Sequence, residues 1–313
     1  MHRSRRSGAR RRAIFSVVGH RSVIVNDPAL TASILGTGQS PNRMDPRMIM
    51  TQINEASGLA GAGASRGPRS AVAAPTNAGF GREAANVAPE LQGKLVVCRG
   101  MSAICVEQYR RLAALLDDIQ NTRSIKKLMV TSSLPREGKT LTVVNLALTL
   151  SESYNRRVLL IDADLRRPAI HAVFGLENKK GLVDVIRSGT TEMPVVEVSP
   201  RLAVLPSGQL KGAAPLAELT SECMRAAINE AASEFDWVLL DTPPVGPLPD
   251  SQLVARLCDG VVFVIAAGST PFEVAQRSIV ELGVDRIVGT VLNRVEERSL
   301  ASNPYYKSYY QTR

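Results

Sequence analysis

Short apolar runs alternate with segments of helical periodicity along most of the chain. Six runs rich in Leu, Ile and Val are nearly continuous, as expected of strands that are covered on both faces of a sheet. They span residues 127–132, 157–162, 202–206, 236–241, 260–266 and 286–293. Apolar residues at helical spacing predict helices before and between them, over residues 102–121, 139–152, 182–188, 215–234, 249–257 and 271–282. This alternation predicts an α/β domain with a doubly wound, mainly parallel sheet over residues 96–303.

The first 95 residues have a different composition. They carry 13 Lys and Arg against 5 Asp and Glu, so 8 of the chain's net charge of +9 lie there. Between residues 57 and 93, Ala, Gly, Pro and Ser make up 23 of 37 residues, too little side chain to offset the chain entropy of folding. We expect a disordered basic tail and linker over residues 1–95, or a start codon placed too far upstream. Loose attraction of the tail to an anionic membrane surface is the alternative.

Charge and cysteine usage exclude several classes of protein. Residues 96–313 hold a net charge of only +1, which argues against nucleic-acid binding by the folded part. The four cysteines show no C-x-x-C spacing, which argues against zinc and fits a reducing cytoplasm. The longest strongly apolar run, residues 260–268, is far shorter than the roughly 20 residues that span a bilayer, so no transmembrane helix is expected.

A phosphate-binding loop follows the first predicted strand. Strand 127–132 runs into Ser-Ser-Leu-Pro-Arg-Glu-Gly-Lys139-Thr140, and a helical pattern begins at once. Backbone N–H groups would hold a β-phosphate, Lys139 would reach the β- and γ-oxygens, and Thr140 would bind Mg²⁺. The first Gly of the usual motif is Ser133 here, and Arg136 stands where a Gly would ease a tight turn. Alone, the Gly-Lys-Thr tripeptide also fits an ordinary loop. The candidate nucleotide-binding residues of the loop are Ser133, Pro135, Arg136, Glu137, Gly138, Lys139, Thr140 and Leu141.

Three carboxylates stand at the carboxyl ends of predicted buried strands. Asp162 and Asp164 follow one strand, and Asp241 ends another. Ligands bind at this edge of such sheets. Ionised carboxylates are costly to remove from water unless they hold a cation or a proton. Mg²⁺ bound to a nucleotide is the most economical explanation.

The chain at this point resembles a known family. The order TSSLPREGKT, LLIDADLRRP, VLLDTPP and GTVLNR is similar to that of the bacterial tyrosine kinases of capsular and exopolysaccharide biosynthesis (BY-kinases), over residues 95–313. The resemblance implies a sheet of the P-loop NTPase type that uses ATP and Mg²⁺. It assigns Lys139 and Thr140 to the Walker A motif, Asp162 and Asp164 to the Walker A′ motif, and Asp241 to Walker B.

The resemblance also implies roles for these residues. Thr140, Asp164 and Asp241 would hold Mg²⁺, directly or through water. Asp162 is the candidate that accepts the proton of the attacking phenol, with Asp164 second, and both join Lys139 as candidate catalytic residues. Asn293 matches a family position near the adenine ring.

Two further features bear on assembly and substrate. The family's oligomerisation motif, Glu-x-x-Arg-x-x-Arg, is matched by Glu107 and Arg110, but its third place is Ala113. A solvated ion pair on a helix is the alternative explanation. The last ten residues, 304–313, hold four of the six tyrosines, and the family implies that such a cluster is autophosphorylated. A tail that docks on a neighbour through its rings is the alternative. The tyrosines concerned are Tyr305, Tyr306, Tyr309 and Tyr310.

These observations favour an ATP-dependent protein-tyrosine autokinase that regulates polysaccharide synthesis and export. By the resemblance, its partners would be a transmembrane polysaccharide co-polymerase on a separate chain, further copies of itself and a cognate tyrosine phosphatase. The protein would be cytoplasmic and recruited to the inner membrane. A partitioning or septum-positioning ATPase of the same fold is the main alternative, but its signature lysine is replaced by Leu134. A degenerate nucleotide-binding regulator is a third.

Overall fold

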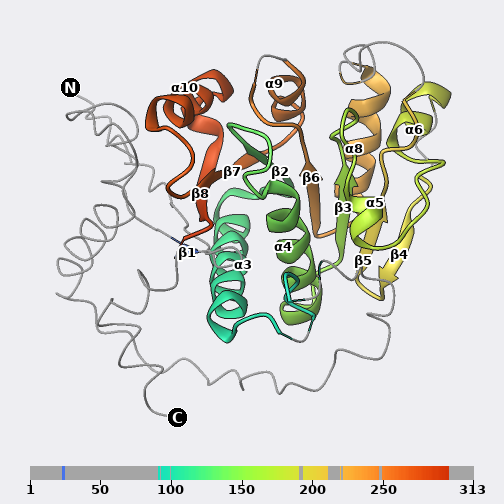
Figure 1. Ribbon diagram of the computed structural model, residues 1–313. Helices are drawn as coiled ribbons and strands as arrows, with labels where there is room; N and C mark the ends of the chain where they lie inside the picture. The colour runs from blue at the N-terminus through green and yellow to red at the C-terminus, as the bar shows by residue number, and fades with distance from the viewer. Residues whose placement is uncertain are drawn as a thin grey trace, which may run out of the picture.

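A single twisted sheet forms the centre of the protein (Figure 1). The computed structural model describes residues 23–24, 91, 93–98, 100–189, 193–210, 219, 221–246 and 249–295. The eight strands lie in the order β1-β8-β7-β2-β6-β3-β5-β4. Their bounds are β1 Val23–Ile24, β2 Lys127–Ser132, β3 Val158–Asp162, β4 Val196–Ser199, β5 Leu202–Leu205, β6 Trp237–Asp241, β7 Gly260–Ala266 and β8 Ile287–Asn293.

The six strands in the middle of the sheet run parallel, and each corresponds to one of the six predicted apolar runs. The predicted fold class, a mainly parallel α/β sheet, is therefore confirmed. The two edge strands, β1 and β4, pair antiparallel and were not predicted. β4 is a short and partly exposed strand, so it carries no apolar run.

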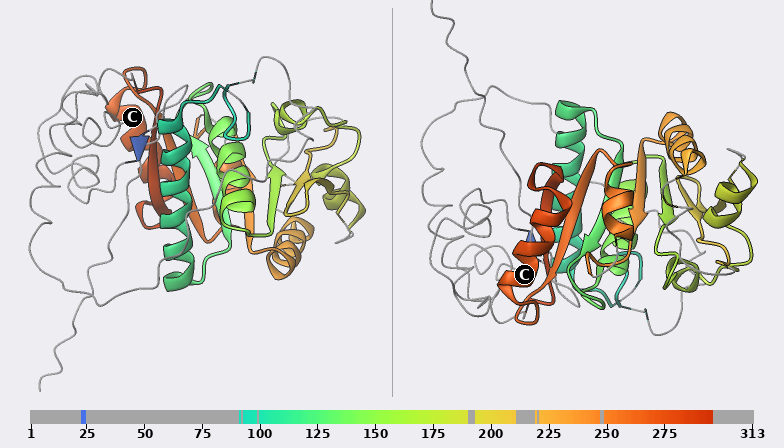
Figure 2. Two further views of the ribbon diagram at one scale, coloured as in Figure 1. Left: turned by 90° about the horizontal axis from the view of Figure 1, so that it is seen from below. Right: turned by 90° about the horizontal axis from the view of Figure 1, so that it is seen from above.

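β1 departs from the expectation of disorder over residues 1–95. Val23 pairs with Leu292 and Ile24 with Val291 of β8, and Figure 2 shows β1 beside that strand. Two residues are too few to give a periodicity signal, so only the edge of β8 makes this strand recognisable. The other residues before Leu91 lie outside the described part of the chain.

Helices cover both faces of the sheet. Their bounds are α3 Ala103–Arg123, α4 Lys139–Ser153, α5 Ile170–Val173, α6 Leu182–Ser188, α8 Glu222–Glu234, α9 Asp250–Ala255, α10 Phe272–Leu282 and the 3₁₀ turn η3 Val284–Arg286. Ser102 caps α3, as expected, by accepting a hydrogen bond from the N–H of Cys105 at 3.3 Å. α9 is shorter than the predicted helix over 249–257, and α5 and η3 are single turns that periodicity does not reveal.

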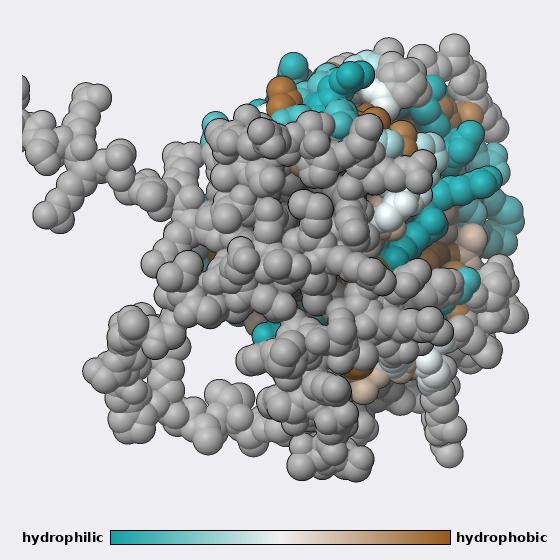
Figure 3. All heavy atoms as spheres, turned by 60° about the vertical axis from the view of Figure 1, so that its left-hand side comes forward, coloured by the Kyte–Doolittle hydropathy of each residue, from teal (hydrophilic) through white to brown (hydrophobic). Residues whose placement is uncertain are grey.

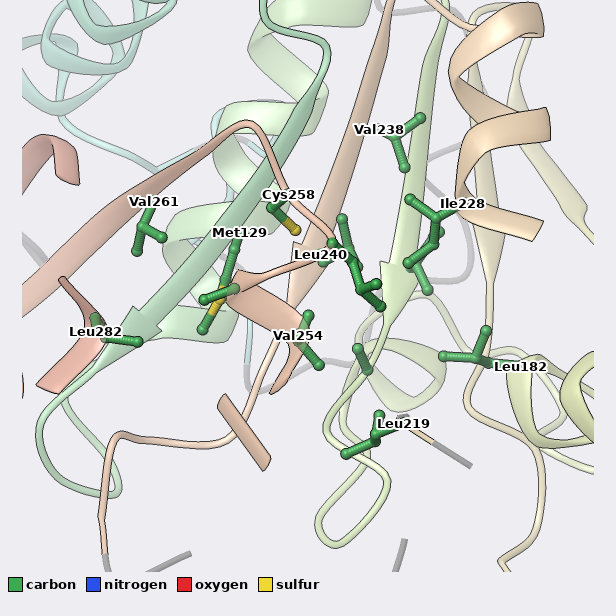
Figure 4. Packing of buried hydrophobic residues seen from close by; sticks show 14 of the residues in the cluster. Met129, Leu182, Leu219, Ile228, Val238, Leu240, Val254, Cys258, Val261 and Leu282 are labelled. Carbon is green, nitrogen blue, oxygen red and sulfur yellow. The ribbon is translucent and has the colours of Figure 1, made fainter. Parts of the chain in front are cut away.

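Alternate strand residues serve two separate cores. Leu128 and Val130 of β2 pack with the apolar faces of α3 and α4, whereas Met129 packs with α8, α9 and α10. Figure 4 shows the second cluster, with Ile228 of α8 beside Val238 of β6. Because both faces are covered, every residue of β3, β6 and β7 is buried, which explains the continuous apolar runs of the sequence.

The folded domain starts earlier than residue 96. Leu95 is completely buried against the α3 and α4 side of the sheet. Asn145 of α4 holds both neighbours, since its Nδ2 donates to the carbonyl of Lys94 at 3.0 Å and its Oδ1 accepts from the N–H of Val96 at 2.8 Å. The predicted boundary between tail and domain therefore moves toward Leu91.

Where Figure 3 shows described residues, mainly along its top and right-hand side, hydrophilic residues predominate and apolar ones lie among them. Within the described ranges, no helix combines the length and the apolar character needed to cross a bilayer.

Candidate active site

The parallel strands bring the three candidate carboxylates to one edge of the sheet. β2 lies between β7 and β6, and β3 lies on the far side of β6. Asp162 at the end of β3 is in register with Asp241 at the end of β6, which in turn pairs with Val130 of β2. β2 ends at Ser132 and continues into the phosphate loop, and α4 begins at Lys139. The loop and the carboxylates thus share this edge.

The loop requires two residues in the left-handed region of backbone space. Gly138 has φ +97°, and a Cβ added there would lie 1.9 Å from Nδ2 of Asn293, so only glycine fits. Arg136 has φ +66°, which confirms that a place favouring glycine is filled by a larger residue. Pro135 and Arg136 are exposed, whereas Ser133 is buried and its hydroxyl has no hydrogen-bond partner among the described residues.

Among the described residues, Lys139 supplies the cation that contacts the carboxylates at this edge. Its Nζ lies 3.0 Å from Oδ2 of Asp164 and 3.6 Å from Oδ1 of Asp241, and just 9% of the residue is exposed. Burial works to lower the pKa of Lys139, but the charges of Asp241 and Asp164 outweigh that effect and raise it above the usual value. The lysine is therefore charged at all physiological pH values.

Thr140 and Asp241 offer oxygen ligands of the kind that Mg²⁺ prefers. The Thr140 hydroxyl donates to Oδ2 of Asp241 at 2.7 Å, while Oδ1 of Asp241 is buried and has no hydrogen-bond partner in the described part of the chain. Burial raises the pKa of Asp241 to about 6, although Lys139 and the Thr140 hydroxyl act in the opposite direction. The described residues contain no group of three His, Cys, Asp or Glu arranged as a metal site. A nucleotide-bound Mg²⁺ needs only one or two carboxylates besides phosphate and water, so this donor set fits.

Asp162 is completely buried behind these residues. Its Oδ2 accepts hydrogen bonds from the backbone N–H groups of Ala169 at 2.9 Å and Ile170 at 3.0 Å. Its Oδ1 accepts one from the backbone N–H of Asp164 at 3.3 Å. The pKa of Asp162 is raised to about 7: burial is the main cause, the charge of Asp241 acts in the same direction, and the two backbone hydrogen bonds oppose both. The carboxylate thus anchors the segment after β3 and titrates near neutral pH.

Comparison with known proteins identifies the family of this chain. A family model described as an AAA domain matches residues 136–267. The tyrosine-protein kinase YwqD of Bacillus subtilis is 32% identical over 225 residues, which cover 71% of this chain and 94% of YwqD. The chain belongs to the bacterial tyrosine-protein kinase family.

Two further relatives extend this result. The kinase domain of the Escherichia coli tyrosine kinase ETK superimposes on this kinase with a TM-score of 0.58 and 29% identity, over 62% of this chain and 77% of ETK's. The succinoglycan biosynthesis transport protein ExoP of Rhizobium meliloti is 29% identical over 201 residues, which cover 62% of this chain but only 25% of ExoP. The match thus corresponds to one quarter of that longer relative.

Two predicted positions have surroundings that the sequence did not reveal. The Glu137 side chain turns inward and accepts hydrogen bonds from the N–H of Leu134 at 2.6 Å and from the hydroxyl of Thr270. Asn293 Nδ2 donates to the backbone carbonyl of Glu137 at 2.7 Å. The side chains of Glu137 and Asn293 therefore stabilise the conformation of the loop. A contact of Asn293 with adenine stays a prediction.

An ion pair near the site was missed by the sequence analysis. Arg166, inside the Walker A′ motif, binds Asp250 at the start of α9 through Nε at 2.5 Å, and the Asp250 side chain is almost fully buried. An acid at the first position of a helix is visible in a sequence. Its pairing with an arginine 84 residues away is not.

Only two of the three positions of the predicted oligomerisation motif on α3 are exposed to solvent. Glu107 and Arg110 lie 3.9 Å apart with side chains that are 50% and 38% exposed, but Ala113 is completely buried. The third place of the motif therefore faces the core of this kinase. The tail tyrosines, Tyr305, Tyr306, Tyr309 and Tyr310, lie outside the described residues.

Proposed function

We propose that this kinase transfers the γ-phosphoryl group of ATP to tyrosine hydroxyls on copies of the same protein, and that it acts in exopolysaccharide or capsule synthesis. The observation that carries the proposal is the position of Lys139, 3.0 Å from Asp164 and 3.6 Å from Asp241, directly after a phosphate loop. Lys139 would exchange these carboxylates for phosphate oxygens when ATP binds. Family membership supports the choice of tyrosine as the acceptor.

In the proposed reaction a tyrosine oxygen attacks the γ-phosphorus, the bond to the β-phosphate oxygen breaks, and the phenolic proton passes to a carboxylate. Asp162 suits this role, because its pKa of about 7 makes it a base near neutral pH and, among the described contacts, its Oδ1 accepts one long hydrogen bond. Asp164 suits it less, since its two oxygens are engaged by Lys139 and the N–H of Arg167.

Thr140 and Asp241, with Asp164 beside them, are the residues proposed to hold Mg²⁺. When bound, the ion would offset negative charge that develops on the transferring phosphoryl group. The chain's own contribution is to fix Thr140 against Asp241 and to keep Lys139 charged in a site largely closed to water.

The described tyrosines are poorly placed as phosphate acceptors, which favours the tail. Tyr109 is 3% exposed. The Tyr154 hydroxyl donates to the carbonyl of Arg110 at 2.8 Å, and burial raises its pKa. A hydroxyl committed to a carbonyl inside the fold cannot reach the γ-phosphate of a second copy without local unfolding. We therefore propose residues 304–313 as the acceptor segment.

The proposal includes partners. We propose that a transmembrane polysaccharide co-polymerase on a separate chain recruits this kinase from the cytoplasm to the inner membrane and stimulates it. The similarity to ExoP, which is named a succinoglycan biosynthesis transport protein, supports a partner of this kind. A homo-oligomer would bring each tail to the active site of a neighbour. Glu107 and Arg110 are exposed enough to contribute to its interface, and Ala113 is not. A cognate tyrosine phosphatase would remove the phosphate groups from the tail.

Purified full-length protein incubated with ATP and Mg²⁺ and probed for phosphotyrosine tests the proposal. Wild type should become phosphorylated, Lys139→Met should not, and replacement of the four tail tyrosines by Phe should remove most of the signal while ATP binding persists. Lys179→Met is the matched control, because that lysine is about three-quarters exposed and pairs only with Glu177 among the described residues. ATP hydrolysis without any phosphotyrosine would instead favour the partitioning-type ATPase.

A further inference from the structure

The phosphate loop is held from outside by the turn after β7. Glu137 sits between the two left-handed residues of the loop, Arg136 and Gly138, and is 3% exposed. One carboxylate oxygen closes the loop on itself through the N–H of Leu134, and the other accepts from the Thr270 hydroxyl, 133 residues away. Thr270 is equally buried. Neither the sequence motif nor the family assignment gave Thr270 a role.

The direction of the Thr270 hydrogen bond is fixed by its surroundings. The Oγ1 of Thr270 accepts from the N–H of Ala266 at 3.1 Å, and the N–H of Thr270 donates to the carbonyl of Ala266 at 3.0 Å. A hydroxyl has a single proton, so this proton is left for the Glu137 carboxylate. The tight turn from Ala266 to Thr270 thus orients the hydroxyl toward the loop.

A second contact from the adjacent strand end completes the support. Asn293 lies at the end of β8. Its side-chain Nδ2 donates to the carbonyl of Glu137, and its backbone carbonyl accepts from the N–H of Ala267 at 2.7 Å. Glu137 is therefore held through its side chain by Thr270 and through its backbone by Asn293. Since Lys139 follows two residues later, a shift of Glu137 would move both the lysine and the N–H groups that face a phosphate.

We propose that Thr270 is a positioning residue for the nucleotide: its hydroxyl holds the Glu137 carboxylate and thereby keeps the phosphate loop in its binding conformation. The proposal rests on the proposed function in that the loop must bind ATP. It goes further in placing a determinant of ATP affinity in the short segment that leads from β7 to α10, outside the nucleotide motifs of the chain.

The test is direct ATP binding, measured by calorimetry in Mg²⁺ with the full-length protein, alongside the KM for ATP and kcat. Thr270→Val keeps the shape and removes the hydroxyl, and it should weaken ATP binding and raise KM roughly tenfold, with a smaller effect on kcat. Thr270→Ser keeps the hydroxyl and should restore most of the affinity. Thr149→Val is the matched control, because Thr149 is also 3% exposed but donates to the Asn145 carbonyl within α4.

A double-mutant cycle with Glu137→Gln separates positioning from a general loss of packing. An amide at position 137 presents only one oxygen and cannot accept both hydrogen bonds, so this variant should also bind ATP weakly. If Thr270 acts through Glu137, Thr270→Val should cost much less in the Glu137→Gln background than in wild type. Should Thr270→Val fail to fold, Thr270→Ser and Glu137→Gln still decide: a Gln variant with wild-type affinity overturns the proposal.

Other outcomes are equally clear. Full ATP affinity in a folded Thr270→Val variant, or the same loss in Thr149→Val, would overturn the role of Thr270 and leave the kinase assignment intact. Absence of ATP binding by the wild-type protein would instead overturn the proposed function.

Discussion

At the scale of single residues, the ammonium group of Lys139 has two carboxylate partners inside the folded chain, Asp164 and Asp241. The side chains of all three are at least 89% buried. A lysine that served the nucleotide alone could be removed without effect on folding. Here its removal leaves two buried carboxylates without a cation, so Lys139 also contributes to the stability of the protein.

Lys139→Met should therefore lower the free energy of unfolding by about 3 kcal/mol at pH 7, besides abolishing phosphorylation. Urea unfolding monitored by circular dichroism measures this change. Adding Asp164→Asn to the variant removes one of the unpaired charges and should recover part of the loss. Equal stability of wild type and Lys139→Met would show that the carboxylates are hydrated or protonated in the free protein.

A second residue-scale prediction concerns Asp162 and pH. Its folded-state pKa of about 7 lies above the ordinary value of 3.8, so the folded protein binds a proton more tightly than the unfolded chain. The associated stability is fully present below pH 3.8 and is lost as the pH rises through 7. Asp162→Asn, whose amide oxygen can still accept from Ala169 and Ile170, should thus raise the thermal midpoint at pH 8 and have little effect near pH 5.

Thermal melts at pH 5, 6, 7 and 8 check this dependence, with the exposed acid in Glu234→Gln as a control that should show no such trend. A variant that is less stable than wild type at every pH would mean that the negative charge of Asp162 is favourable in the fold. The same carboxylate would then be a poor candidate for the base.

At the scale of elements, α4 has two functions that lie on different turns of the helix. Its first residues, Lys139 and Thr140, face the carboxylates at the strand ends. Asn145, near its middle, holds the segment around Leu95 through two hydrogen bonds. The helix therefore connects the site to the beginning of the folded domain.

Asn145→Ala should reduce the free energy of unfolding by about 1–3 kcal/mol, because two partly buried backbone groups of Lys94 and Val96 lose their partner. Chemical unfolding of the variant measures this effect. Asn229→Ala is the control, since Asn229 is exposed and accepts only from the Lys127 ammonium group among the described contacts. Similar small effects of both substitutions would show that water replaces Asn145 at no cost.

At the scale of the whole molecule, charge and fold are distributed unevenly. Nearly all of the net charge lies in the first 95 residues, whereas the sheet and its two helical layers are built from the rest. β1 is the exception, and it adds only two residues to the edge of β8. The long N-terminal segment therefore makes a small contribution to the described sheet.

Deletion of residues 1–90 should lower the thermal midpoint by only a few degrees and leave phosphotyrosine formation in place, because the described part of the chain loses only the two residues of β1. A deletion of residues 1–98 is the sharper comparison. It also removes the fully buried Leu95, and loss of a buried leucine side chain costs about 2–5 kcal/mol. Equal midpoints for the two deletions would contradict the boundary near Leu91.

The sequence by itself determined the kind of fold and the chemistry at its edge. The apolar runs from 127–132 to 286–293 predicted all six parallel strands, because a strand covered on both faces is apolar at every position. The loop before Lys139 and the acids Asp162, Asp164 and Asp241 were visible for a similar reason. Each stands at the end of a predicted strand or just after it, and parallel strands end at one edge.

Only the tertiary structure decided which residues touch across that edge and where the domain begins. The hydrogen bond from Thr270 to Glu137 joins residues 133 apart, and that from Asn293 to Glu137 joins residues 156 apart. The antiparallel edges β1 and β4, the burial of Ala113 and the partners of Asn145 were equally hidden. The periodicity of apolar residues shows which face of its helix or strand is buried. Which polar group meets it there depends on the order of the strands in the sheet, and that order is set by packing among segments distant in the chain.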